Sequence, residues 1–213
     1  MTLPRLYPIL DTESLARRSC DLVQAAEAML AGGARILQFR HKGDYTREVF
    51  DRLRTVAALC HAAGAAFVVN DRADLAGLVD AGVHLGQDDL PPSDARRILG
   101  PQRLIGLSTH NPEQLSAART EPIDYIAFGP VFATRSKTNA DRPVGLDGLS
   151  LATCNDAGGL PVVAVGGITR ENARQALAAG AACLAVIQDL LPEPCTPEGL
   201  RARMEEWQRL VTN

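Results

Sequence analysis

Short runs rich in Val, Ile and Leu recur along the whole chain. Most of these runs are continuously apolar rather than alternating, a pattern typical of strands that are buried on both faces of a parallel sheet. The sequence therefore predicts eight buried strands, at residues 6–10, 36–40, 66–70, 82–86, 104–108, 125–129, 161–167 and 183–188.

Stretches in which apolar residues recur at roughly the helical period lie between these runs. The first covers residues 14–30 and is followed by Gly32-Gly33, as is common after the end of a helix. A later stretch opens at Asn111-Pro112, an N-cap residue followed by proline at the first helical position. Further helices are predicted at residues 45–63, 72–80, 93–99, 169–179 and 196–211.

This alternation of strands and helices predicts parallel strands joined by right-handed crossovers. Eight such units indicate an α/β protein, a (β/α)8 TIM barrel that forms a single domain over residues 1–213. The alternative is an open, doubly wound sheet, which would carry a glycine-rich dinucleotide loop early in the chain, and the sequence has none there. In a TIM barrel the active site lies at the carboxyl ends of the strands.

The composition excludes several classes of protein. Of 213 residues, 46% are hydrophobic and 22% charged, as in folded globular proteins rather than disordered ones. A formal net charge of −3 and an aromatic content of 4% argue against a nucleic-acid partner. We expect neither a membrane span nor a signal peptide, and five cysteines without a C-x-x-C pair do not indicate disulfides or zinc. We therefore expect a cytoplasmic protein with small-molecule ligands. The sequence does not decide whether it forms a homo-oligomer.

Polar side chains gather where the second predicted strand ends. Gln38, Arg40 and Lys42 alternate there, so they share one face of an extended segment. Two cations and an amide that converge at the end of a barrel suit a phosphate or pyrophosphate. Charges that simply point to water would give the same pattern, so this feature alone does not decide between a binding site and a solvated strand end.

Two acids follow the next two predicted strands. Asp71 comes directly after the third run and Asp89 shortly after the fourth. Each alone is explained by a helix cap or an acidic turn. Because neighbouring strands end side by side, the two carboxylates can approach each other, and Mg2+ commonly binds such oxygens together with substrate phosphates. Beside Arg40 and Lys42, the acids favour a site for a metal ion and a pyrophosphate.

A second group of candidate anion-binding residues follows the later strands. Hydroxyls and cations alternate after the sixth strand, and glycines at the end of the seventh let backbone N–H groups approach a phosphate at the start of a helix. The loops after the last two strands form the usual phosphate site of TIM barrels. The candidates are Ser108 at the end of the fifth strand, Thr134, Ser136 and Lys137 after the sixth, Gly167 at the end of the seventh, and Ile187 and Gln188 at the end of the eighth.

Six segments together resemble one known family, thiamine phosphate synthase. They stand in the family's order and extend over nearly the whole chain. They are QFRHK at residues 38–42, NDRAD at 70–74, GVHLGQDD at 82–89, GLSTH at 106–110, FGPVFATRSK at 128–137 and AVGGI at 164–168.

The resemblance implies a transferase with two small-molecule substrates and Mg2+ as cofactor. One substrate is 4-amino-2-methyl-5-pyrimidinylmethyl diphosphate and the other is hydroxyethyl-methylthiazole phosphate, and the products are thiamine phosphate and pyrophosphate. In this family the pyrophosphate is thought to leave first, and the thiazole nitrogen then captures the pyrimidinylmethyl cation. Such a reaction asks the protein mainly to stabilise charge and exclude water.

The resemblance also implies a role for each candidate. Asp71 and Asp89 match the Mg2+ ligands. Among the residues that hold the diphosphate substrate, Arg40, Ser108 and Lys137 are implied to be catalytic. Gln188 departs from the family, in which serine is more usual at this position. The positions matching the pyrimidine diphosphate site are Gln38, Arg40, Lys42, Asn70, Ser108 and Lys137, and those matching the thiazole phosphate site are Thr134, Ser136, Gly167, Ile187 and Gln188.

Two alternatives remain. The first is a thiazole tautomerase with the same barrel, which this chain resembles at residues 40–42, at Gly166-Gly167 and at His110. Such an enzyme is not expected to keep the Mg2+ acids, so Asp71 and Asp89 favour the synthase. The second is a barrel that binds a phosphate ligand without catalysis, in which the paired acids beside a basic strand end would have no use.

Overall fold

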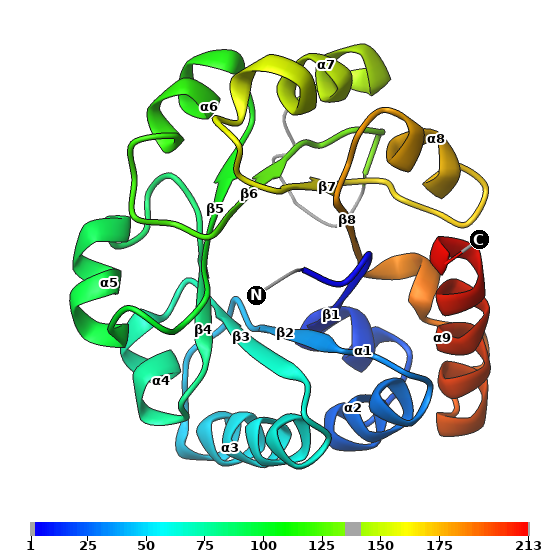
Figure 1. Cartoon of the computed structure of the whole chain (residues 1–213). Helices are drawn as coiled ribbons and strands as arrows, with labels where there is room; N and C mark the ends of the chain where they lie inside the picture. Colours follow the sequence, from blue (N-terminus) through cyan, green and yellow to red (C-terminus); the bar gives the residue numbers. More distant parts are fainter. Residues whose placement is uncertain (1–2, 135–141, 213) are drawn as a thin grey trace.

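Parallel strands in the computed structural model close into a barrel, with helices arranged around its outside (Figure 1). The structure describes residues 3–134 and 142–212. Each strand pairs with the next one along the chain, and β8 pairs back with β1, which confirms the predicted (β/α)8 barrel. The described strands are β1 (Leu6–Asp11), β2 (Ile36–Arg40), β3 (Ala66–Asn70), β4 (Gly82–Leu85), β5 (Ile105–Thr109), β6 (Tyr125–Phe128), β7 (Val162–Val165) and β8 (Cys183–Val186).

The helices pack against the outer face of the strands, and the last of them, α9, lies beside α2 (Figure 1). None of the helices in the described part of the chain is long and apolar enough to cross a membrane. Their bounds are α1 (Thr12–Arg17), α2 (Leu22–Ala31), α3 (Arg47–Ala62), α4 (Ala73–Leu78), α5 (Pro92–Leu99), α6 (Pro112–Ala118), α7 (Gly145–Leu151), the π-helix η1 (Ala152–Asp156), α8 (Ala173–Ala178), the 3-10 helix η2 (Gln188–Leu190) and α9 (Pro197–Thr212).

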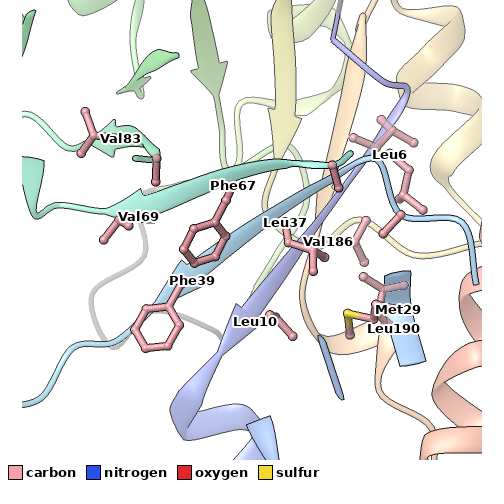
Figure 2. Packing of buried hydrophobic residues seen from close by; sticks show 14 of the residues in the cluster. Leu6, Leu10, Met29, Leu37, Phe39, Phe67, Val69, Val83, Val186 and Leu190 are labelled. Carbon is pink, nitrogen blue, oxygen red and sulfur yellow. The ribbon is translucent and has the colours of Figure 1, made fainter. Parts of the chain in front are cut away.

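Side chains alternate along the strands between two apolar cores. One core lies between the barrel and its helices, where Figure 2 shows Leu37 and Phe39 of β2, Phe67 of β3 and Met29 of α2. The other core fills the interior of the barrel. Because each strand has a buried face in both cores, its sequence is a continuous apolar run. The interior core consists of Tyr7, Ile9, Ile36, Val68, Tyr125, Ala127, Val163, Cys183 and Ala185.

The single helix predicted over residues 14–30 is wrong, because the structure has two helices there. α1 begins after Asp11, whose carboxylate accepts a hydrogen bond from the Ser14 backbone N–H at 2.9 Å. α2 begins after Asp21, whose carboxylate likewise caps its first turn. Between them Ser19 has a φ of +52°, which interrupts a right-handed helix. Two N-cap residues therefore divide one stretch of helical periodicity into two elements.

Other boundaries also differ from the sequence prediction. α7 and η1 follow β6, where the periodicity predicts no helix. The helix after β7 begins at Ala173 rather than at Thr169, because Asn172 closes a turn there. Its Oδ1 accepts from the Thr169 backbone N–H at 2.8 Å, and its Nδ2 donates to the Gly167 carbonyl at 2.9 Å. β8 ends at Val186, two residues earlier than predicted.

Gly106 in β5 leaves the space in which the ring of Tyr125 lies. A Cβ atom at Gly106 would stand 2.0 Å from Tyr125 Cζ and 2.4 Å from its hydroxyl oxygen. We expect Gly106→Ala to lower the free energy of unfolding by about 1–3 kcal/mol, because a fully buried ring has to move. Denaturant unfolding measures this change. The control is Gly77→Ala in α4, where the nearest contact of a Cβ is 3.4 Å, and it should be neutral or stabilising. Unfolding midpoints that change equally in both variants would contradict this account.

Candidate active site

Arg40 is held at the end of β2 by an acid from the neighbouring strand. Asp11 ends β1 directly opposite Arg40, and the Arg40 guanidinium donates to Asp11 Oδ2. The other oxygen of Asp11 accepts from the backbone N–H and the hydroxyl of Ser14, at 2.9 and 2.6 Å. Asp11 therefore caps α1 and orients Arg40 at once. Asp11 is not among the residues predicted from the sequence. Its position after an apolar run and three residues before Ser14 is the N-cap signal that could have found it.

Asp71 lies in a tight turn after β3 that brings its carboxylate beside Lys42. Its φ of +66° is in the left-handed region, which aspartate tolerates better than most residues. The Asp71 backbone N–H donates to the His84 carbonyl of β4 at 2.8 Å, so the turn is attached to the next strand. Lys42 Nζ lies 2.5 Å from Asp71 Oδ2. Strands β2, β3 and β4 thus together fix this acid.

Asp89 lies in the turn after β4, close to Asp71. Its carboxylate accepts from the Gly86 backbone N–H at 2.6 Å. Gln87 attaches the same turn to β5, because its Nε2 donates to the Ser108 carbonyl at 2.6 Å. The pKa of Asp89 is raised above its usual value, first by burial and then by a hydrogen bond with Asp71 and by its charge, while Lys42 and the Gly86 N–H act in the opposite direction. The structure therefore brings together the two acids that the sequence predicted to meet.

This pair of acids suits a divalent cation that is shared with a substrate. Within the described residues, no three or more His, Cys, Asp or Glu side chains form a cluster that could hold a metal by themselves. Mg2+ is usually bound through one or two carboxylates, water and substrate phosphates, so two carboxylates are enough. The closeness of Asp71 favours a proton on the Asp89 carboxylate, and a cation bound between the two acids would replace that proton. The donor set fits Mg2+ bound together with a phosphate ligand.

Three of the predicted substrate-binding residues are buried at the carboxyl end of the barrel. Gln38, Asn70 and Ser108 are 3%, 6% and 9% exposed. Gln38 Nε2 donates to Tyr7 OH at 3.2 Å, and the Ser108 hydroxyl lies 2.9 Å from His84 Nε2. Asn70 Nδ2 has no hydrogen-bond partner in the described part of the chain. A buried amide donor without a partner is costly in a folded protein, so it marks a position for a ligand acceptor.

The predicted second anion site is built from segments after β6 and β7. Val131 and Phe132 donate backbone hydrogen bonds to the carbonyls of Val165 and Gly166, at 2.9 and 3.0 Å. Gly167 has a φ of +66°, and a Cβ there would lie 2.5 Å from the Ala133 carbonyl oxygen. The glycines therefore allow the segment that leads to Thr134 to lie against the end of β7. This steric role differs from the predicted helix N-terminus at residue 169, since α8 begins only at Ala173.

Gln188 is already engaged by other side chains at the start of η2. Its Oε1 accepts from the Arg18 guanidinium and its Nε2 donates to the Ser14 hydroxyl, both at 2.8 Å. The hydroxyl of Ser14 in turn donates to Asp11. Gln188 thereby connects Arg18, near the end of α1, to the acid that orients Arg40. Ile187 precedes it, between β8 and η2. Two further candidates, Ser136 and Lys137, lie outside the described residues.

The closeness of the two acids gives a direct test by titration. We expect Asp71→Asn to lower the pKa of Asp89, because the substitution removes the charge that disfavours ionisation of Asp89. In the wild type the raised pKa means that the folded state binds more protons than the unfolded chain. This group's contribution to stability therefore falls as pH rises through the acid range, and Asp71→Asn should reduce that fall. Titration of the Asp89 side-chain 13C signal measures the pKa. Asp94→Asn on α5 is the control, and an Asp89 pKa that is the same in all three proteins would refute the coupling.

Comparisons with known proteins show which family this chain belongs to. The family described as thiamine monophosphate synthase matches residues 6–190. The thiamine-phosphate synthase of Koribacter versatilis is 44% identical over 197 residues, which are 91% of this chain and 92% of that protein. The corresponding protein of Pelotomaculum thermopropionicum is 40% identical over 200 residues, 93% and 88% of the two chains. The solved structure of thiamine phosphate pyrophosphorylase from Pyrococcus furiosus matches with a TM-score of 0.83 and 35% identity, covering 98% of this chain and 95% of that one. This chain therefore belongs to the thiamine monophosphate synthase family.

Proposed function

We propose that this protein is a thiamine-phosphate synthase that joins a pyrimidinylmethyl group to a thiazole. The C–O bond between the methylene carbon and the diphosphate breaks, pyrophosphate leaves, and the thiazole ring nitrogen forms the new C–N bond. The observation that carries the proposal is the pair of acids, Asp71 and Asp89, beside Lys42 in a chain of this family. A tautomerase of the same barrel has no departing diphosphate, so it would not use these acids.

The acids after β3 and β4 would hold Mg2+ in this reaction. Bound there, the ion supplies positive charge to the pyrophosphate as it leaves. Lys42 would bind an oxygen of the same diphosphate, because Lys42 Nζ lies 2.5 Å from Oδ2 of the proposed metal ligand Asp71. Arg40 ends β2 two residues before Lys42 and is kept in place by Asp11. Both cations are therefore oriented before the substrate arrives, which is the arrangement that favours charge stabilisation during catalysis.

The pyrimidine would lie over the buried polar residues that face the end of the barrel. Gln38, Asn70 and Ser108 offer it amide and hydroxyl groups, and the Nδ2 group of Asn70, which has no partner among the described residues, supplies one further donor. Pyrophosphate is a good leaving group, so breaking its bond requires little proton transfer from the protein. We therefore assign His110 no role as a general base in this reaction; its Nδ1 lies 2.6 Å from the Gly129 carbonyl oxygen.

The thiazole phosphate would bind at the ends of the later strands. Thr134 and Gly167 lie on segments that pack against each other there, and Ile187 and Gln188 follow β8. We assign Ser136 to the same phosphate and Lys137 to the diphosphate, on the family pattern of the sequence. Gln188 would act through the Arg18 guanidinium that it binds, so that a cation takes part at a position where the resemblance implies a serine.

Metal dependence tests the proposal most directly. We expect Asp71→Asn and Asp89→Asn each to lower the rate of thiamine phosphate formation by about 10²–10³-fold, because each removes a ligand of the main charge stabiliser. Binding of the thiazole phosphate should change little, since its site does not include these acids. The measurements are product formation as a function of Mg2+ concentration and binding of the thiazole phosphate by calorimetry.

The matched control is Asp94→Asn, which removes an exposed carboxylate on α5 that pairs with Arg97. It should keep the wild-type rate and Mg2+ dependence. Full activity of the wild type in excess EDTA would overturn the metal-dependent mechanism, as would wild-type turnover in both acid variants.

A second prediction concerns Lys137. We expect Lys137→Ala to lower kcat by more than it weakens binding of the thiazole phosphate, because a cation that meets growing charge acts more strongly on the transition state than on the bound substrate. Steady-state kinetics with both substrates, together with direct binding of the thiazole phosphate, separate the two effects. A variant with unchanged kcat would remove Lys137 from the catalytic set.

A further inference from the structure

A chain of hydrogen bonds crosses the interior of the barrel below the proposed pyrimidine site. The distances are 3.2 Å between Gln38 Nε2 and Tyr7 OH, 3.0 Å between the hydroxyls of Tyr7 and Tyr125, 3.1 Å between Tyr125 OH and His84 Nδ1, and 2.9 Å between His84 Nε2 and Ser108 Oγ. All five side chains are buried. The two ends of this chain, Gln38 and Ser108, are both residues to which we assign contact with substrate.

The barrel interior is shaped to hold the middle of this chain. Tyr125 occupies the space that Gly106 leaves free on β5. The His84 ring stacks on the Tyr125 ring with centroids 5.6 Å apart, and Tyr7 meets Tyr125 edge to face at 6.0 Å. Burial is the largest cause that raises the pKa of both tyrosines well above the usual value. Both phenols therefore keep their protons, and each has one proton to donate.

This count of protons gives the chain a direction. Tyr7 accepts from the Gln38 amide, so its own proton goes to Tyr125, and the proton of Tyr125 goes to His84 Nδ1. A neutral imidazole that accepts at Nδ1 carries its proton at Nε2. That N–H then donates to Ser108 Oγ, which leaves the hydroxyl proton of Ser108 for a ligand. Reversing one bond requires all of them to reverse, with the Gln38 carbonyl turned toward Tyr7.

We infer that this series of hydrogen bonds couples two properties: whether Ser108 donates or accepts, and whether Gln38 donates or accepts. His84 is the residue that positions Ser108 as a donor. The amide of Gln38 is committed to Tyr7 as a donor, so its carbonyl oxygen accepts from a ligand while Ser108 donates to it. A ring with an amino group and an acceptor nitrogen has the complementary pattern, and its oxo analogue, with C=O and ring N–H, has the opposite one. The assignment of this ligand rests on the proposed function, but the direction of the chain does not.

The direction can be measured in the free protein from the 15N signals of His84. We expect the wild type to carry the imidazole proton at Nε2. In Gln38→Glu, an ionised carboxylate can only accept, so Tyr7 must donate to it and the proton of His84 should move to Nδ1. The spectra are recorded at a pH at which the 13C signal of the new carboxylate shows that it is ionised. Gln24→Glu, on the exposed face of α2, adds the same charge away from the chain and should leave His84 unchanged.

A second variant distinguishes coupling through the chain from a general disturbance. Tyr125→Phe removes the central hydroxyl, so in this background Gln38→Glu should no longer move the proton of His84. A wild-type His84 protonated at Nδ1 or at both nitrogens would overturn the inference, and so would a Gln38→Glu variant whose His84 keeps its proton at Nε2. None of these measurements uses substrate or turnover. Failure here would leave the synthase proposal intact, and absence of thiamine phosphate formation would leave the direction of the chain intact.

The consequence for specificity is measured separately. When each proton in this series of hydrogen bonds points toward Ser108, kcat/KM should be at least about 10²-fold higher for the 4-amino pyrimidine diphosphate than for its 4-oxo analogue. The oxo compound leaves buried polar groups of the site unpaired. Equal kcat/KM values for the two compounds would contradict the donor and acceptor pattern described above.

Discussion

The alternation of side chains in a closed parallel barrel is the constraint on which the site depends. In β1 the inward positions run from Tyr7 through Ile9 to Asp11, and in β2 from Ile36 through Gln38 to Arg40. The deeper members fill the interior core, and the last members, Asp11 and Arg40, form an ion pair at the proposed site. A slip of one residue in either strand would turn its charged end outward beneath the helices and its outer apolar residues into the interior. The apolar core and the polar end of the barrel are therefore parts of one pattern.

Closing the barrel also brings like charges together at its carboxyl end. Among the groups that pair there, three carboxylates, Asp11, Asp71 and Asp89, face two cations, Arg40 and Lys42. This set has a formal charge of −1, which would repel a diphosphate. A divalent cation would reverse the sign to +1, whereas without it the pKa of Asp89 is raised, first by burial and then by the neighbouring Asp71. Under the proposed function, the surplus acid would make binding of the anionic substrate depend on the metal.

The sequence was enough to predict the barrel, because eight continuous apolar runs require strands buried on both sides. It also indicated the acids Asp71 and Asp89, since consecutive strands of a barrel end side by side. It did not reveal the break between α1 and α2, because two N-caps within one apolar-periodic stretch leave the helical period unchanged. The sequence did not reveal the partner of Arg40, because Asp11 meets Arg40 only when β1 and β2 pair. Tyr7 and Tyr125 were read as part of apolar runs, and their hydroxyls meet only when distant strands close the barrel.

The buried hydrogen bonds from Gln38 to Ser108 contribute both to the stability of the fold and to the arrangement of the proposed site. A buried hydroxyl without a partner costs roughly 1–3 kcal/mol, whereas Tyr7 and Tyr125 each have a hydrogen-bonding neighbour on either side. Removing both tyrosine hydroxyls would not remove this cost, because Gln38 Nε2 and His84 Nδ1 would then lose the hydroxyls to which they bond. The network is therefore satisfied only as a whole. Since its outer members are Gln38 and Ser108, the bonds that satisfy the polar groups of the barrel interior also hold the two residues to which we assign contact with the substrate.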